Sequence, residues 1–204
     1  MSLEQLFTDR VVAVVRAPEI PDVRALCAAL AAGGIRTVEL TFTTPDVLRH
    51  LREAAGAEGI SLGVGTVLDD DDARAAIDAG ARFLVTPGLR PAVATAAVAA
   101  GIPFLMGAFT PSEVLVAHES GAAAVKVFPA GRLGPGYLTD LHGPYPDVRL
   151  VPSGGVSAGN AAEYLAAGAA AVTAGTGVVP PQLVAAADWA GITERAAAFV
   201  AAMG

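Results

Sequence analysis

The sequence alternates short apolar runs, rich in β-branched residues, with Ala-rich helical segments, and glycines mark the joints between them. Such a glycine follows five helical segments, a few residues before the next apolar run: Gly34, Gly80, Gly101, Gly121 and Gly168. Glycine is common just beyond a helix C-terminus because it adopts the left-handed backbone conformation without strain. Strands that alternate with helices predict βα units around a parallel sheet.

Eight apolar runs are present, the number that closes a (β/α)8 barrel. They cover residues 11–16, 37–42, 61–67, 82–86, 103–108, 123–130, 148–152 and 171–174. We expect one α/β domain, residues 1–204, in which a short leading N-terminal helix at residues 2–7 precedes a (β/α)8 TIM barrel. The alternative is a doubly wound open sheet, which usually carries a glycine-rich phosphate fingerprint after its first strand. That place is occupied here by Arg16, Ala17 and Pro18.

Composition argues against several classes of protein. The formal net charge of −7 at pH 7 disfavours nucleic acid and anionic membranes as partners. No apolar run is long enough to span a bilayer, and residues 1–10 do not resemble a secretion signal. Cys27 is the single cysteine and excludes a disulfide framework, while the histidines lack metal-ligand spacing. We expect a soluble, cytoplasmic protein with no metal, no nucleic-acid partner and no membrane partner.

Lys126 is the only lysine of a chain in which Lys and Arg together number 13. It lies inside the sixth apolar run rather than on a helix surface. Burial disfavours the charged ammonium, and a neutral amine is a nucleophile toward carbonyl carbons. Arginine cannot act in this way because its guanidinium keeps its proton. A compositional bias against lysine explains its rarity but not its place in a strand, so we predict a chemical role for Lys126.

Functional side chains of a barrel lie at the C-terminal ends of its strands. Glu39, in the second run, can therefore meet Lys126 at the mouth, where a carboxylate relays protons beside a Schiff-base lysine. Strand residues alternate their facing, so spacing leaves open whether both point inward. The alternative is a Glu39 that is solvated or paired with Arg16 or Arg36. Arg16, which ends the first run, is either a clamp for a substrate carboxylate or a surface cation.

Two glycine-rich segments follow the seventh and eighth runs. The first contains Ser153, Gly154 and Gly155, and the second contains Gly175, Thr176 and Gly177. Glycine lets backbone N–H groups approach an anion closely, and a helix N-terminus behind the loop adds to the attraction. Phosphate sites at these two loops recur in barrels. We therefore predict phosphate binding here, and the alternative is a pair of ordinary tight βα turns.

Five short motifs follow one another along the chain. They are VELTFT at residues 38–43, GVGTV at 63–67, VTPG at 85–88, VKVFPA at 125–130 and VPSGGV at 151–156. In this order and spacing they resemble the 2-keto-3-deoxy-6-phosphogluconate (KDPG) / 4-hydroxy-2-oxoglutarate (KHG) aldolase family, and the resemblance covers nearly the whole chain. It implies a (β/α)8 barrel, a homotrimer, class I aldolase chemistry in carbohydrate metabolism, and neither a metal nor a cofactor.

The resemblance also implies roles for individual residues. Lys126 would be the Schiff-base lysine and Glu39 the proton-shuttling glutamate, with Thr66, Pro87 and Phe128 in the pyruvate pocket. The phosphate loops of the family fall on Ser153, Gly154, Gly155, Gly175 and Thr176.

Two positions depart from the family pattern. Thr43 stands where some members carry an arginine that contacts the carboxylate end of the substrate. We keep Thr43 among the expected substrate-binding residues and expect Arg16 to supply the cation. Ser153 stands where threonine is common, and it keeps the hydroxyl group. These departures bear on substrate choice more than on reaction type.

The reaction that the resemblance implies is reversible aldol cleavage. The substrate is KDPG, which gives pyruvate and glyceraldehyde 3-phosphate, or KHG, which gives pyruvate and glyoxylate, or both. Three alternatives stay open on sequence alone. One is cleavage of the C4 epimer, 2-keto-3-deoxy-6-phosphogalactonate. The second is a non-covalent phosphosugar isomerase or synthase on the same barrel, and the third is a phosphosugar-binding protein without catalysis.

Overall fold

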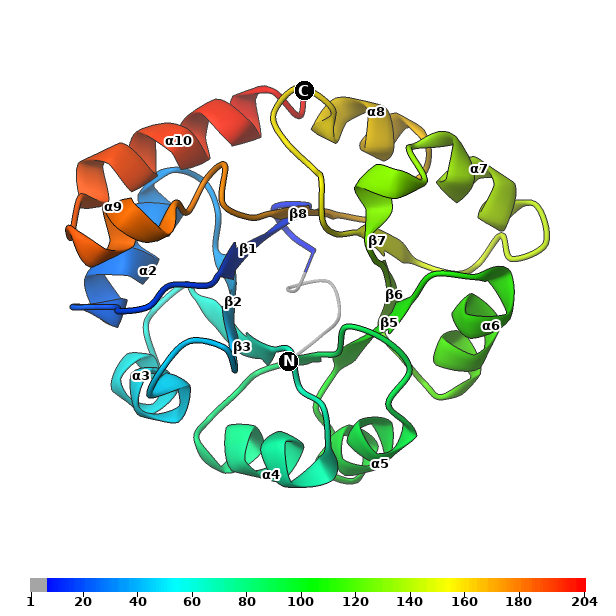
Figure 1. Cartoon of the computed structure of the whole chain (residues 1–204), viewed down its shortest axis with the longest axis horizontal. Helices are drawn as coiled ribbons and strands as arrows, with labels where there is room; N and C mark the ends of the chain where they lie inside the picture. The colour runs from blue at the N-terminus through cyan, green and yellow to red at the C-terminus, as the bar shows by residue number, and fades with distance from the viewer. Residues whose placement is uncertain (1–6) are drawn as a thin grey trace.

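The computed structural model of this chain describes residues 7–204. Its strands are β1 Val11–Val15, β2 Thr37–Thr41, β3 Ser61–Gly65, β4 Leu84–Val85, β5 Phe104–Ala108, β6 Ala124–Val127, β7 Leu150–Pro152 and β8 Val172–Ala174. They form one parallel sheet in the order β7-β6-β5-β4-β3-β2-β1-β8. The seam between β7 and β8 is bridged by two hydrogen bonds, Ala170 N to Leu150 O at 2.9 Å and Thr173 Oγ1 to Pro152 O at 3.2 Å. The strands form a nearly closed ring surrounded by helices (Figure 1), which confirms the predicted (β/α)8 barrel.

Helices surround the ring of strands. They are α2 Val23–Ala32, α3 Val47–Ala54, α4 Asp70–Asp78, α5 Pro91–Ala99, α6 Pro111–Glu119, α7 Gly136–His142, α8 Ala161–Ala166, α9 Pro181–Ala185 and α10 Trp189–Ala201, with a 3-10 turn, η1, at Ala130–Arg132. The Asp22 and Asp69 carboxylates cap α2 and α4 by accepting N–H groups of the first turn. Thr110 and Glu113 form a capping box at the start of α6, a pattern that is readable in the sequence.

One expectation about the elements falls outside the described residues, and two are corrected. The leading helix at residues 2–7 lies outside them except for Phe7, which is in a turn. β4 spans two residues rather than the expected 82–86. The pair Thr44-Pro45 has the sequence form of a helix cap followed by a first-turn proline and predicts a helix start there, but α3 begins after Asp46. The Thr44 hydroxyl instead accepts a hydrogen bond from Ala17 N at 3.3 Å.

The apolar core has an outer and an inner part. Outward-facing strand residues such as Val38, Leu40, Val125 and Val127 are fully buried against the helices. Inward-facing residues fill the ring: Val12, Phe83, Val85, Leu105, Ala124, Val151 and Ala171. Because successive strand residues face opposite sides, β1, β4, β5, β6 and β7 each supply both parts. This explains why the strands appear in the sequence as continuous apolar runs.

The single cysteine and the character of the helices bear on possible thiol chemistry and on membrane insertion. Cys27 lies buried in the outer core, where burial raises the pKa of its thiol to about 12, so this cysteine is a packing residue and not a reactive thiol. Among the helices of residues 7–204, none has the length and apolar character that crossing a membrane requires.

Candidate active site

Lys126 and Glu39 both face the interior of the barrel. Lys126 follows Ala124 by two positions on β6, and Ala124 belongs to the inner core. Glu39 lies on β2 between Val38 and Leu40, which belong to the outer core. Because side chains alternate along a strand, both charged groups point into the ring. The structure thus settles the facing that spacing alone left open.

The two groups form a buried ion pair. Lys126 Nζ lies 3.9 Å from Glu39 Oε1, and the two side chains are 8% and 2% exposed. Glu39 Oε1 makes no hydrogen bond within the described chain. The Lys126 ammonium also lies 5.5 Å from the centroid of the Phe128 ring. A buried carboxylate oxygen without a partner is costly, and it is placed to exchange a proton with a group bound beside the amine.

Glycines on β3 make room for the Glu39 side chain. Glu39 pairs with Gly63 in the ladder, and Gly65 follows two residues later. A Cβ added at Gly65 would lie 1.7 Å from Glu39 Oε1, and one at Gly63 would lie 2.5 Å from the Phe83 ring. Gly65 is therefore required for the observed position of the carboxylate, whereas Gly63 accommodates the inner core.

Thr66 and Pro87, which follow β3 and β4, are held by local geometry. Thr66 has a φ of 59°, a left-handed conformation that costs a β-branched residue about 1–3 kcal/mol and that concentrates at functional sites. Pro87 packs against Gly107 of β5, where a Cβ would come within 2.2 Å of the Pro87 carbonyl carbon. The Thr86 hydroxyl donates to Gly88 O at 2.7 Å and accepts from Gly107 N at 3.1 Å. Both predicted pocket residues therefore have a fixed backbone.

Hydroxyl groups connect Arg16 with Thr43, the two residues expected to bind a carboxylate. Thr41 Oγ1 lies 2.8 Å from Thr43 Oγ1 and 3.5 Å from Thr44 Oγ1. Thr44 Oγ1 in turn accepts from Ala17 N, the neighbour of Arg16 in the chain. Arg16 and Thr43 are exposed just beyond β1 and β2. The loops that carry them are therefore tied together at the mouth of the barrel.

The segment after β6 packs directly on the loop after β7. Ala130 N donates to Ser153 O at 2.8 Å, and Gly131 N donates to Gly154 O at 2.7 Å. Gly154 and Gly155 have φ values of 78° and 87°. A Cβ at Gly155 would lie 2.8 Å from Gly131 Cα. The positive φ values and this close approach explain the glycine pair.

The two predicted phosphate loops present backbone donors that the protein does not use. Within residues 7–204, the N–H groups of Gly154, Gly155, Val156 and residues 175–177 donate no hydrogen bond. The helices that follow are short, with six residues in α8 and five in α9. The expected contribution from a helix N-terminus behind the loops is therefore corrected, because the dipole of so short a helix is small. Attraction for an anion must come from the loop N–H groups themselves.

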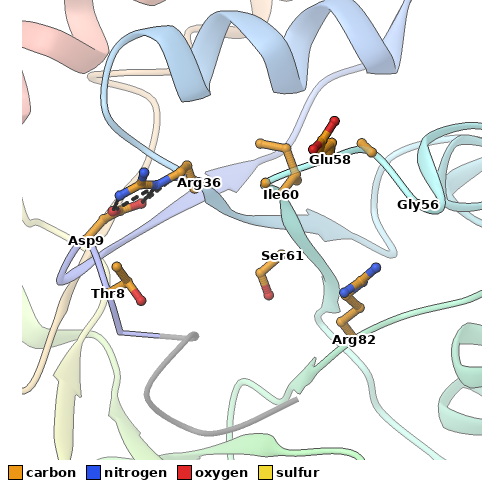
Figure 2. Close-up of a pocket in the computed structure, with 10 residues that line it drawn as sticks. Thr8, Asp9, Arg36, Gly56, Glu58, Ile60, Ser61 and Arg82 are labelled. Carbon is orange, nitrogen blue, oxygen red and sulfur yellow. Dashed lines mark hydrogen bonds and ion pairs between the residues drawn. The ribbon is translucent and has the colours of Figure 1, made fainter.

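A cavity of about 590 Å³ lies at the opposite end of the barrel. Its lining includes Asp9, Arg36, Ser61 and Arg82, which lie at or before the N-terminal ends of strands (Figure 2). Asp9 accepts from Arg36 N at 2.9 Å and pairs with the Arg36 guanidinium. Arg36 is thus engaged away from Glu39. Residues at this end of a barrel serve stability rather than chemistry, so this cavity is not the candidate active site.

Glu39 lies in the middle of β2, and the other predicted site residues lie near the C-terminal ends of the strands or in the loops that follow them. The hydrogen bonds and close contacts described above join these residues in separate groups. Phe128 joins two of these groups, because it lies beside Lys126 and a Cβ at Gly154 would come 3.0 Å from its ring. Gly175 and Thr176 make no hydrogen bond to Ser153, Gly154 or Gly155.

Sequence reasoning assigned no role to three supporting residues, Gly65, Gly107 and Thr86. The signal for the glycines was their place inside strands, where glycine often marks a close approach. Gly65 and Thr86 also lie inside the GVGTV and VTPG motifs, and Thr86 stands at a strand end. Among the described residues, no group of three or more His, Cys, Asp or Glu side chains is arranged to hold a metal ion.

Comparison with known proteins identifies the family. A family model described as KDPG and KHG aldolase matches residues 3–195. The 2-dehydro-3-deoxy-phosphogluconate aldolases of Treponema pallidum and Pseudomonas aeruginosa are each 37% identical to this chain, covering 93% and 89% of it and 91% and 83% of their own lengths. A KDPG aldolase from Legionella pneumophila, solved with pyruvate captured as a covalent carbinolamine intermediate, is 30% identical with a TM-score of 0.89, over 97% of this chain and 98% of that chain. The chain belongs to the KDPG and KHG aldolase family.

Proposed function

We propose that this protein is a Schiff-base aldolase, a carbon–carbon lyase that cleaves KDPG to pyruvate and glyceraldehyde 3-phosphate. KHG, cleaved to pyruvate and glyoxylate, is the second substrate. The observation that carries the proposal is the buried ion pair of Lys126 and Glu39, in which Nζ and Oε1 lie 3.9 Å apart inside the barrel and Oε1 accepts no hydrogen bond. Membership of the family supports the reaction type. A relative captured with a covalent pyruvate carbinolamine supports attack by such an amine.

The first half of the reaction builds the imine. The Lys126 ammonium first gives a proton to the Glu39 carboxylate, and the neutral Nζ then attacks the C2 ketone and forms a C–N bond. A second proton passes from this nitrogen to the C2 oxygen, which completes the carbinolamine. Glu39 then donates the proton that it took from the ammonium to the same oxygen, which leaves as water. The product is a protonated imine between C2 and Lys126.

The second half breaks the carbon chain. The Glu39 carboxylate takes the proton of the C4 hydroxyl, and the C3–C4 bonding pair moves toward the imine nitrogen, so that the aldehyde departs and an enamine remains. Glu39 gives the proton that it took from the C4 hydroxyl to C3 of the enamine, which restores a protonated imine. Water then adds at C2, and the C–N bond breaks to release pyruvate and the free Lys126 amine.

The other predicted residues bind the two ends of the substrate. Arg16, Thr43 and Thr66 orient the carboxylate, Pro87 and Phe128 enclose the carbons next to it, and Ser153, Gly154, Gly155, Gly175 and Thr176 hold the phosphate. The tied loops of Arg16 and Thr43 and the unused N–H groups after β7 and β8 support this division.

The proposed function is tested by measuring pyruvate release from KDPG, from KHG and from the C4 epimer of KDPG, in an assay coupled to lactate dehydrogenase. We expect pyruvate from KDPG with the highest kcat/KM. Faster cleavage of the epimer would make the epimer the preferred substrate and leave the assigned reaction type unchanged. A phosphosugar isomerase or synthase would release no pyruvate, and a binding protein would bind KDPG without turnover. A folded protein that releases no pyruvate from any of the three would overturn the proposal.

Gly65→Ala should lower activity with little effect on the fold. The added methyl group overlaps the Glu39 side chain, because the Cβ position lies 1.7 Å from its Oε1 and 2.6 Å from its Cγ, so the carboxylate must move. A displacement of about 1 Å at a reacting group can cost about 100-fold in rate, so we expect kcat for KDPG to fall by that order. The matched control is Gly136→Ala on α7, where the Cβ meets nothing within 4 Å. Equal kcat values for the two variants would contradict the positioning role of Gly65.

The homotrimer and the cytoplasmic location are part of the same proposal. Exposed apolar side chains on neighbouring helices, Val98 on α5 and Val116 on α6, support an interface between copies. We expect multi-angle light scattering to give three times the chain mass of 20.3 kDa. A mass that stays at one chain over the working concentration range would exclude the trimer.

A further inference from the structure

A cavity of about 260 Å³ lies beside the two predicted phosphate loops. Val156 and Ser157 of the loop after β7 line one side of it, and Gly175 and Gly177 of the loop after β8 line another. Arg195 and Phe199 of α10 complete the wall. The cavity therefore brings together both loops and a helix that the family motifs do not include.

Arg195 reaches this cavity because of the register of α10. The Asp188 carboxylate caps the helix by accepting from Gly191 N at 3.0 Å. Ile192, Ala196 and Phe199 then form its buried face. Arg195 is four residues before Phe199, so both lie on the side of the helix that meets the cavity.

Arg195 is the charged residue of this lining. Its Nη1 donates to Gly177 O at 3.3 Å, and among residues 7–204 no carboxylate pairs with it. The side chain is exposed, and a guanidinium has further donors in a planar fork that matches two phosphate oxygens. One bond to the loop thus leaves most of its hydrogen-bonding capacity for a ligand.

A local cation at this place favours phosphate binding for an electrostatic reason. Its net charge is −7, so its overall field repels a phosphate ester that carries up to two negative charges. The unused N–H groups of the two loops supply only partial positive charge, and α8 and α9 are too short to add much dipole. A guanidinium supplies a full charge.

We propose that Arg195 is a specificity-determining residue that binds the phosphate group of the substrate and makes the enzyme select phosphorylated 2-keto-3-deoxy sugar acids. The proposal rests on the aldolase function proposed above and names the substrate class of the same site. The phosphate lies between the N–H groups of the loops and the Arg195 fork, at the cavity that both loops line. Arg195 does not take part in bond making or breaking.

The test compares two substrates that differ only in the phosphate, KDPG and 2-keto-3-deoxygluconate. Arg195→Gln removes the charge, and Arg195→Lys keeps it without the planar fork. The control is Arg52→Gln, an exposed arginine on α3. One charge-assisted hydrogen bond accounts for about tenfold in binding. We expect Arg195→Gln to raise KM for KDPG about tenfold, with kcat and the cleavage of 2-keto-3-deoxygluconate unchanged and Arg195→Lys between wild type and Arg195→Gln.

The outcomes separate this proposal from its rivals. If Arg195→Gln slows both substrates equally, Arg195 only holds the Gly177 loop, and the proposal is overturned. No change with either substrate overturns it as well. If high salt raises the KM of the wild type for KDPG as Arg195→Gln does, the result supports the proposal, because salt screens an exposed cation. If wild type releases pyruvate from neither substrate, the aldolase function fails first and the Arg195 proposal fails with it.

Discussion

Lys126→Ala is expected to lower kcat for KDPG cleavage by about 10⁴-fold or more, because loss of a covalent nucleophile removes the whole route through the intermediate. The barrel should stay folded. The lost side chain is buried but charged, and β6 keeps Val125 and Val127 in the outer core. Circular dichroism and thermal melting are used to establish that the variant is folded before its cleavage rate is measured.

The covalent intermediate is tested by measuring the intact mass of the protein after incubation with pyruvate and borohydride. Wild type should gain one reduced pyruvate adduct, and Lys126→Ala should gain none, because only an imine can be reduced onto the protein. Lys126→Arg is the sharper control, since it keeps the positive charge beside Glu39 and cannot form the imine. An active Lys126→Arg variant would mean that Lys126 acts electrostatically, as in a non-covalent isomerase or synthase.

The barrel was predictable from sequence because its signals are local. Apolar runs buried on both faces, capping residues such as Thr110 with Glu113, and glycines after helices are each determined within a few residues. Thr44 shows the limit of this reasoning. A threonine before a proline has the form of a helix cap, but its hydroxyl bonds to Ala17 N, 27 residues away in the chain. A local pattern cannot show a tertiary partner of this kind.

The candidate site was predictable in its members and not in its geometry. The burial of Lys126 and its place in a strand pointed to chemistry, yet the alternation of facing left its orientation relative to Glu39 open. Orientation depends on the register between β2 and its neighbour, which pairs Glu39 with Gly63 and brings Gly65 under the carboxylate. Arg195 gave no local signal at all, because only the packing of α10 brings it to the loops.

Glu39→Gln is expected to lower kcat for KDPG by about 10²- to 10⁴-fold, the usual contribution of a general acid–base group. Glutamine has nearly the same shape, so it fits the space that Gly65 leaves and the fold should be kept. It cannot exchange a proton with the bound substrate. The borohydride adduct on Lys126 should still form, only more slowly, which separates loss of proton transfer from loss of the nucleophile.

Deuterium exchange into the methyl group of pyruvate isolates the proton-transfer step. Enamine formation removes a methyl proton, and reprotonation at C3 in D₂O returns a deuteron, so NMR follows the exchange without the aldehyde. Glu39→Gln should slow this exchange as much as it slows cleavage, whereas Glu119→Gln on the exposed side of α6 should slow neither. Exchange at the wild-type rate in Glu39→Gln would assign the base to another residue. Glu39 would then serve only as the charge partner of Lys126, because its Oε1 would carry no proton in the reaction.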